Sequence, residues 1–176
     1  MIKPLMLALS CVIACATAQA QDTVACKASA YVVDPDPQGL NVRAGPGSAS
    51  KALARIHNGD LVRITGARGQ WIRIDRAESE ADSEDYQTVF SGEGWIFGPL
   101  LGVGPSWNED GKTPVHEQPS AGSRVLQRLA YEANPGGVLQ GCRGDWLDLQ
   151  YEGKPRPLRG WVEAGKVCVN LRTECS

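Results

Sequence analysis

The sequence predicts an all-β fold made of two small units in tandem. Two segments alternate apolar and polar side chains with the period of two that is typical of a half-buried strand, Leu40–Arg43 and Trp71–Asp75. The 176 residues include 20 glycines and 11 prolines, which favours many turns and few long helices. The second part of the chain repeats the glycine and tryptophan pattern of the first, which predicts a duplicated unit.

The first unit is predicted to consist of short strands separated by turns. The strands are expected over Ala30–Val33, Leu40–Arg43, Lys51–Ile56, Leu61–Ile64, Trp71–Asp75, Gly94–Phe97 and Leu100–Val103. Asp34-Pro35-Asp36-Pro37 and Gly45-Pro46-Gly47 are predicted as turns, because proline removes a ladder donor and glycine adopts backbone angles that other residues avoid. His57-Asn58-Gly59-Asp60 is predicted as a hairpin turn from its Asn-Gly pair. Residues 76–92 are rich in Asp and Glu, so we expect a solvated loop there.

Three motifs of the first unit resemble the bacterial SH3 family. They are GLNVRAGPG at residues 39–47, GQWIRI at residues 69–74 and GWI at residues 94–96. The resemblance runs from Asp36 to Val103. It implies a small SH3-like β-barrel, and it implies binding in the bacterial cell envelope, where the family is known for recognising peptidoglycan.

The second unit aligns with the first at three places. Val115–Ser120 aligns with Val42–Gly47, Gly141–Leu149 with Gly66–Ile74, and Gly160–Val162 with Gly94–Ile96. Its opening has no "NVR" sequence, so its resemblance to the family is weaker than that of the first unit. We therefore predict two tandem small SH3-like β-barrels, with domain 1 over residues 30–104, a linker over 105–111 that contains Trp107, and domain 2 over 112–176.

The first twenty residues have the features of a secretory signal peptide. Lys3 is followed by an apolar run and by Ala18-Gln19-Ala20, a small-x-small cleavage pattern. Val12-Ile13-Ala14-Cys15 also resembles a lipobox, which leaves a lipid anchor at Cys15 as an alternative. We expect a periplasmic or secreted protein, with an outer-membrane lipoprotein as the alternative and no transmembrane segment in the mature chain.

Charge and cysteine usage restrict the partners further. Cleavage after Ala20 removes one charged residue, Lys3, and changes the net charge from −2 to −3, which argues against a nucleic-acid partner. Four cysteines remain, and an even number in an exported chain favours disulfides. We expect the pairs Cys142–Cys168 and Cys26–Cys175. No metal site is predicted, because no close ligand pair such as CxxC is present.

The candidate binding residues are aromatic and charged side chains on the outer face of the predicted strands. Trp71 and Trp146 point away from the rows of Ile72/Ile74 and Leu147/Leu149, so their rings are able to stack on a sugar or a peptide. Arg43 is a candidate carboxylate-binding fork, or else a structural partner of Asp60 or Asp75. Arg73 and Asp60 complete the predicted ligand-binding set. Trp95 and Trp161 are expected to be structural.

Neither histidine suggests catalysis. His57 lies in a turn and His116 takes the position of Arg43, and neither belongs to a catalytic or metal-binding motif. We therefore expect no enzyme activity and no cofactor. The hypothesis is a non-catalytic exported protein that binds peptidoglycan or a wall peptide in a groove beside Trp71 or in the cleft between the units. The alternative is a periplasmic inhibitor or immunity-type protein that binds a partner enzyme through its acidic segment 78–85.

Overall fold

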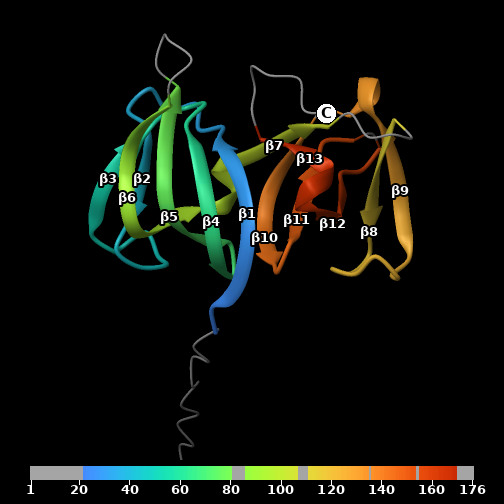
Figure 1. The fold of residues 1–176 in the computed structure, drawn as a ribbon, viewed down its shortest axis with the longest axis horizontal. Coiled ribbons are helices and arrows are strands. Elements are labelled where there is room, and N and C mark those ends of the chain that lie inside the picture. Colours follow the sequence, from blue (N-terminus) through green and yellow to red (C-terminus); the bar gives the residue numbers. More distant parts are fainter. Residues whose placement is uncertain (1–21, 81–85, 107–110, 135, 154, 170–176) are drawn as a thin grey trace, which may run out of the picture.

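The all-β fold class is confirmed by the computed structural model, which describes residues 22–80, 86–106, 111–134, 136–153 and 155–169 (Figure 1). The strands are β1 Val24–Val32, β2 Leu40–Arg43, β3 Ala52–Ile56, β4 Leu61–Arg68, β5 Trp71–Glu80, β6 Tyr86–Phe97, β7 Leu101–Pro105, β8 Lys112–His116, β9 Val125–Ala130, β10 Gly137–Arg143, β11 Trp146–Tyr151, β12 Leu158–Glu163 and β13 Val167–Cys168. Three short 3-10 helices occur within these ranges: η1 Gly98–Leu100, η2 Tyr131–Ala133 and η3 Ala164–Lys166.

All thirteen strands belong to one hydrogen-bonded system in which β7 has a central place. The strand order is β3-β2-β6-β5-β4-β1-β7-β10-β11-β12-β8-β9, and β13 also pairs with β7. Strand β7 therefore contacts β1 on one side and both β10 and β13 elsewhere along its length. The predicted boundary between residues 104 and 105 falls inside β7, because Pro105 still pairs with Val167 of β13. We refer to β1–β7 as the first half and to β7–β13 as the second half.

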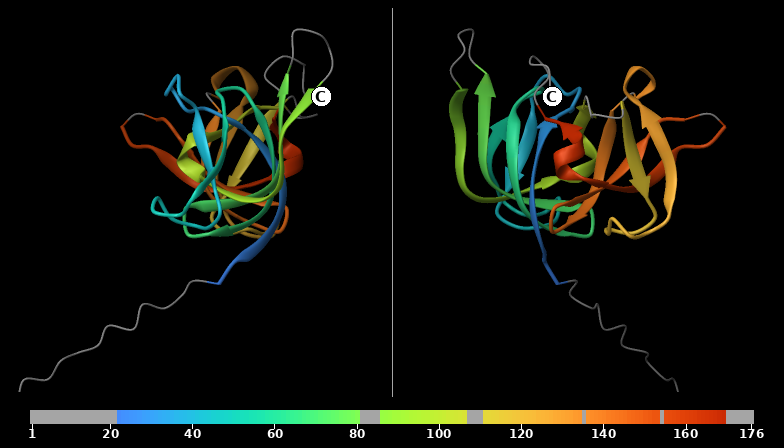
Figure 2. Two further views of the ribbon diagram at one scale, coloured as in Figure 1. Left: turned by 90° about the vertical axis from the view of Figure 1, so that its left-hand side faces the viewer. Right: turned by 45° about the vertical axis from the view of Figure 1, so that its right-hand side comes forward.

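The two halves have the same order of neighbouring strands. The first half reads β3-β2-β6-β5-β4-β1-β7, and the second reads β9-β8-β12-β11-β10-β7-β13. Along the chain, β7 is the last strand of the first half, where it corresponds to β13 of the second half. It is also the first strand of the second half, where it corresponds to β1 of the first half. Figure 1 shows β7 running between the two halves, which also lie side by side in the right view of Figure 2.

The predicted inward and outward faces of β5 are correct. In β11 the inward row is correct, but Asp148 of the outward row is buried as well. Ile72 and Ile74 are completely buried. Trp71, which precedes them, and Arg73, which lies between them, are partly exposed. The equivalent rows of β11 also bury their leucines completely, at positions 147 and 149. Strand alternation therefore places one set of side chains in the core and the other on an outer face.

The acidic insertion is predicted as a solvated loop, and this prediction is wrong: most of it extends a β-hairpin. Strands β5 and β6 pair from Trp71↔Phe97 to Glu80↔Tyr86, so most of residues 76–92 lies in strands. Because Arg76 and Glu78 alternate with the buried Ala77, this arm has a strand pattern that its acidity obscured. The central part of the acidic segment, residues 81–85, lies outside the described residues.

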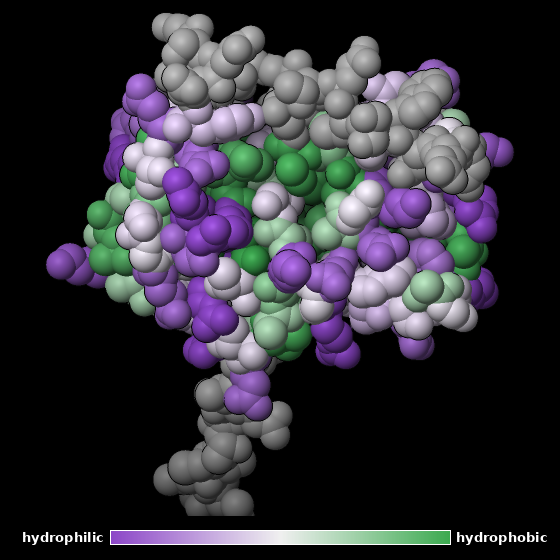
Figure 3. Space-filling model, viewed as in Figure 1, coloured by the Kyte–Doolittle hydropathy of each residue, from purple (hydrophilic) through white to green (hydrophobic). Residues whose placement is uncertain are grey.

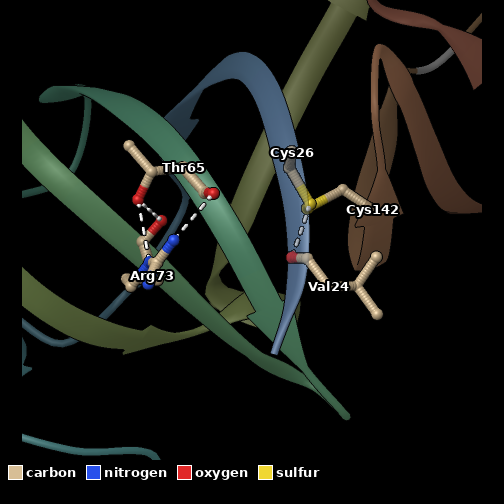
Figure 4. The surroundings of a disulfide bond; sticks show 5 residues. All are labelled: Val24, Cys26, Thr65, Arg73 and Cys142. Atoms are coloured by element: carbon tan, nitrogen blue, oxygen red, sulfur yellow. Dashed lines mark hydrogen bonds between the residues drawn. A yellow bond between two sulfur atoms is a disulfide. The ribbon is translucent and has the colours of Figure 1, made fainter. Parts of the chain in front are cut away.

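The predicted disulfide pairing is wrong. Cys26 of β1 is bonded to Cys142 of β10 across the junction of the two halves, with an S–S distance of 2.07 Å (Figure 4). This bond excludes both Cys142–Cys168 and Cys26–Cys175. Cys168 is disulfide-bonded as well. Cys175, Trp107 and the predicted signal segment lie outside the described residues.

Backbone and side-chain hydrogen bonds reinforce the junction. The Lys27 N–H donates to Gly144 O at 2.8 Å, and the Gly144 N–H donates to Ala25 O at 2.8 Å. The side-chain amide of Gln70 donates to the Gln140 amide oxygen at 2.8 Å. The halves are therefore joined by a shared strand, a covalent bond and direct hydrogen bonds rather than by a flexible connection.

Candidate functional site

A groove of about 440 Å³ lies beside Trp71 on the first half. It is lined by Asp34, Asp36, Gly39, Leu40, Asn41, Arg43, Ser48, Trp71, Phe97 and Leu100. We call it the Trp71 groove. Its residues come from β2, from the start of β5, from the end of β6, from η1, and from the connections between β1 and β2 and between β2 and β3. It is the groove beside Trp71 that the sequence hypothesis required.

The aromatic wall of the groove is formed by Trp71 and Phe97. These residues are directly opposite one another in the β5–β6 register, and their side chains lie on the same face. Their ring centroids are 5.7 Å apart with an interplanar angle of 55°. Both side chains are half-buried, so part of each ring remains accessible to a ligand.

One rim of the groove is formed by the Asp34–Pro37 turn, which follows β1. The Asp34 Oδ1 accepts the Asp36 N–H at 3.0 Å, and the Asp36 Oδ1 accepts the Gln38 N–H at 2.9 Å. The Val33 N–H donates to Leu100 O at 2.9 Å, which fixes the start of this turn against η1. The turn therefore places two carboxylates at a defined position on the rim.

Arg43 supplies a positive charge to the same groove. Its Nη1 donates to Ser50 O at 2.8 Å. The predicted structural partners of Arg43 are engaged elsewhere: Asp75 forms an ion pair with Arg63 at 2.6 Å, and the Asp60 carboxylate accepts the His57 N–H at 2.7 Å. Within the described residues Arg43 thus has no carboxylate partner, and the expected pairing with Asp60 or Asp75 is wrong.

Arg73 and Asp60 are not part of the groove. The Arg73 Nε donates to Thr65 Oγ1 at 3.1 Å, and its Nη2 donates to Thr65 O at 3.3 Å (Figure 4). Asp60 is only 3% exposed and holds its own hairpin turn. Both side chains therefore lie outside the groove and are hydrogen-bonded within the protein, and of the five predicted ligand-binding residues Arg43 and Trp71 line the groove.

Trp146 has a different environment in the second half. In the strand register it is opposite Glu163, where Trp71 is opposite Phe97, so its cross-strand neighbour is a carboxylate and not a phenyl ring. The buried ring of His116 packs edge-on against it, with centroids 5.2 Å apart and an interplanar angle of 80°. His116 takes the place of Arg43, and Trp146 is partly exposed, as Trp71 is.

Trp95 is structural, as predicted, because it is only 4% exposed and the Arg68 guanidinium carbon lies 5.5 Å from its ring centroid. Trp161 is partly exposed. The sequence interpretation missed Asp34, Asp36 and Phe97. The Asp-Pro-Asp-Pro pattern indicated only a turn, and Phe97 becomes a site residue only through its register opposite Trp71.

A second groove of about 450 Å³ lies at the junction of the halves. Its walls include Ala28 of β1, Ile64 of β4, Ala164 of η3, and Val167 and Val169 near β13. Apolar surface is visible near the middle of this face, over the junction (Figure 3). This seam groove corresponds to the predicted cleft between the units, but it brings together none of the five predicted ligand-binding residues.

No three of the His, Cys, Asp or Glu side chains in the described ranges are grouped so that they could hold a metal ion. None of the helices in these ranges has the length and apolarity that a bilayer crossing requires.

Comparison with known proteins identifies the class of the first half. The family model "Bacterial SH3 domain" matches residues 38–102, so the chain carries a bacterial SH3 domain and the predicted resemblance is confirmed there. The match includes Arg43, Trp71 and Phe97 of the Trp71 groove. No curated protein matches the chain. Among solved structures, NlpC1 from Trichomonas vaginalis is similar, with 11% identity and a TM-score of 0.29 over 90% of this chain and 50% of that one. The chain thus spans about half the length of that protein.

Proposed function

We propose that this chain is a non-catalytic, exported binding protein of the bacterial cell envelope, and that it recognises peptidoglycan or a wall peptide in the Trp71 groove. The observation that carries the proposal is the position of Trp71, Phe97 and Arg43 around one groove in the part of the chain that matches the bacterial SH3 domain. An accessible aromatic wall in the same groove as an arginine that has no carboxylate partner among the described residues is suited to a ligand with both apolar and anionic groups.

The disulfide bonds support export. The Cys26–Cys142 bond fits an extracytoplasmic protein, because such bonds persist in oxidising compartments and are rare in the cytosol. We propose a periplasmic or secreted location after cleavage behind Ala20, with lipidation at Cys15 as the alternative route to the outer membrane.

The second half is proposed to be a second SH3-like unit that makes the first half rigid and does not bind the ligand. Its strands follow the same neighbour order as those of the first half. However, the His116 ring is in T-shaped contact with Trp146, and Glu163 stands where the first half has Phe97. The second half then lacks the Trp–Phe pair and the arginine that line the Trp71 groove.

The test is retention of the mature protein on purified sacculi at low salt. We expect Trp71→Ala to weaken retention roughly tenfold or more, because a central aromatic residue commonly accounts for about 2 kcal/mol of binding. The matched control is Trp146→Ala at the equivalent position of the second half, which should bind like the unmodified protein. No retention of the unmodified protein, or equal losses in the two variants, would reject the proposal.

A second candidate function uses the extended β5–β6 hairpin. Tyr86 and Val89 on this arm are 43% and 41% exposed, which is unusual for large apolar side chains and is typical of a protein interface. In this alternative the arm binds a periplasmic partner enzyme. Shortening the hairpin from residues 79–87 to a two-residue turn should then abolish a stoichiometric protein complex and leave sacculus binding unchanged.

A further inference from the structure

We infer that the ligand of the Trp71 groove is zwitterionic, and that Asp34 holds a primary ammonium group of this ligand while Arg43 holds a carboxylate. This inference rests on the proposed function and adds the chemical class of the ligand. It assigns recognition to the peptide part of the wall, since an ammonium group is absent from a glycan strand whose amino groups are acetylated.

The hydrogen bonding of the Asp34 carboxylate is the first observation behind this inference. Asp34 is only 8% exposed and lines the groove. Its Oδ1 accepts the Asp36 N–H, whereas its Oδ2 has no hydrogen-bond partner among the described residues. Since this Oδ2 is not a fully buried atom, it can be reached from the groove, and a donor there would complete the hydrogen bonding of the carboxylate. The open side of this group is the groove, so the missing donor is expected to come from the ligand.

The charge of that donor follows from the surroundings of Asp34. Asp36 contributes a second carboxylate to the same rim. No ion pair joins Arg43 to either aspartate within the described part of the chain. The rim is therefore an uncompensated negative site, and a cationic donor is favoured over a neutral one.

Arg43 adds a charge of the opposite sign to the lining of the same groove. The hydrogen bond from Arg43 Nη1 to Ser50 O fixes the guanidinium, and its Nε and Nη2 donate to no residue in the described ranges. These donors are suited to a carboxylate. Trp71 and Phe97 lie in the same groove, where they can contact the aliphatic part of the ligand or the face of its ammonium group.

The experiment measures binding of three soluble probes to the mature protein by calorimetry. The probes are the wall peptide L-Ala-γ-D-Glu-meso-diaminopimelate, the same peptide with both amines acetylated, and chitotriose. We expect the free peptide to bind, and acetylation to weaken binding tenfold or more. Asp34→Asn should weaken binding of the free peptide to a similar extent but should leave binding of the acetylated peptide unchanged. Asp75→Asn, outside the groove, is the matched control.

The outcomes separate this inference from the proposed function. Equal binding of the free and acetylated peptides by the unmodified protein, or tighter binding of chitotriose, would overturn the ammonium site even if sacculi are retained. Equally tight binding of an unrelated lysine-containing peptide would also count against a wall ligand and would indicate a protein partner. If Asp34→Asn does not fold, as judged by its thermal melt, the comparison of free and acetylated peptide on the unmodified protein still decides the question.

Discussion

Gly94 and Val42 are packed so closely that a Cβ atom on Gly94 would collide with the Val42 Cγ1. The second half repeats this relationship: a Cβ on Gly160 would lie 2.7 Å from the Val115 Cγ1 and 2.6 Å from His116 O. A valine of one strand thus occupies the space beside a glycine of the next, at equivalent places in both halves. This contact explains why a glycine precedes the tryptophan in each GW motif.

We predict that Gly94→Ala destabilises the protein by about 1–3 kcal/mol, because the added methyl group overpacks the core. Gly160→Ala should have a similar effect in the second half. The matched control is Gly165→Ala, where nothing lies within 4 Å of the added Cβ. Urea unfolding measures the three changes. A Gly94→Ala variant as stable as Gly165→Ala would contradict this account of the GW motif.

The hydroxyl of Tyr151 is buried, and it has no hydrogen-bond partner among the described residues. We predict that Tyr151→Phe leaves the free energy of unfolding unchanged at pH 7 or raises it by about 1 kcal/mol, since it removes an unsatisfied polar group. A loss of more than about 1 kcal/mol in chemical unfolding would show that the hydroxyl is satisfied.

The same residue predicts a pH dependence. Burial raises the pKa of the Tyr151 phenol above its ordinary value of 10.0. The folded protein therefore keeps its proton when the unfolded chain has begun to lose it, so this contribution is complete below pH 10 and declines as the pH rises further. Tyr151→Phe should make the alkaline loss of stability smaller. Thermal melts of both proteins between pH 8 and pH 11 test this, and identical alkaline profiles would contradict it.

The bond between Cys26 and Cys142 joins residues 116 positions apart. We predict that replacing both cysteines by alanine costs about 2–5 kcal/mol, because the bond limits the freedom of a long unfolded loop. Thermal melts measure the loss. A non-reducing peptide map of the unmodified protein should contain a linked peptide with Cys26 and Cys142. A peptide that links Cys142 to Cys168 would contradict the structure.

The ion pair of Asp148 and Arg159 differs from the surface pairs. Its atoms are 2.6 Å apart and the Asp148 side chain is only 12% exposed, and this carboxylate raises the pKa of Arg159. We predict that Arg159→Gln costs about 1–3 kcal/mol, because it leaves a mostly buried carboxylate without a charged partner. Arg63→Gln, which removes an exposed pair of the same length, should have a much smaller effect in urea unfolding. Equal effects would contradict the role of burial.

The fold was largely predictable because local alternation and the repeated motifs report burial directly. Ile72 and Ile74 face the core as their spacing indicates, and the "GLNVRAGPG" opening lies within the residues matched by the bacterial SH3 domain. Acidic composition concealed the β5–β6 extension, because charged side chains on the two exposed faces of a hairpin arm look like those of a loop. In the sequence, the single apolar residue Ala77 indicates the buried face of this strand less clearly than the charged residues around it indicate a loop.

The candidate site was predictable only in part. Trp71 and Arg43 were found because outward aromatic and arginine side chains on strands are recognisable from periodicity. Asp34 and Phe97 are brought to them by pairings between distant segments, namely β1 with β7 and η1, and β5 with β6. Disulfide pairing has the same difficulty, since spacing along the chain does not reveal that Cys26 meets Cys142.

The shared strand β7 has a mechanical consequence. It is the last strand of the first half and the first strand of the second. A bending motion between the halves therefore has to disturb the pairing of β7 with β1 or with β10. A pulling force applied to a ligand in the first half would pass along one continuous strand into the second. The two halves are therefore expected to move as one rigid body, and neither half can be excised or exchanged without removing a strand from the other.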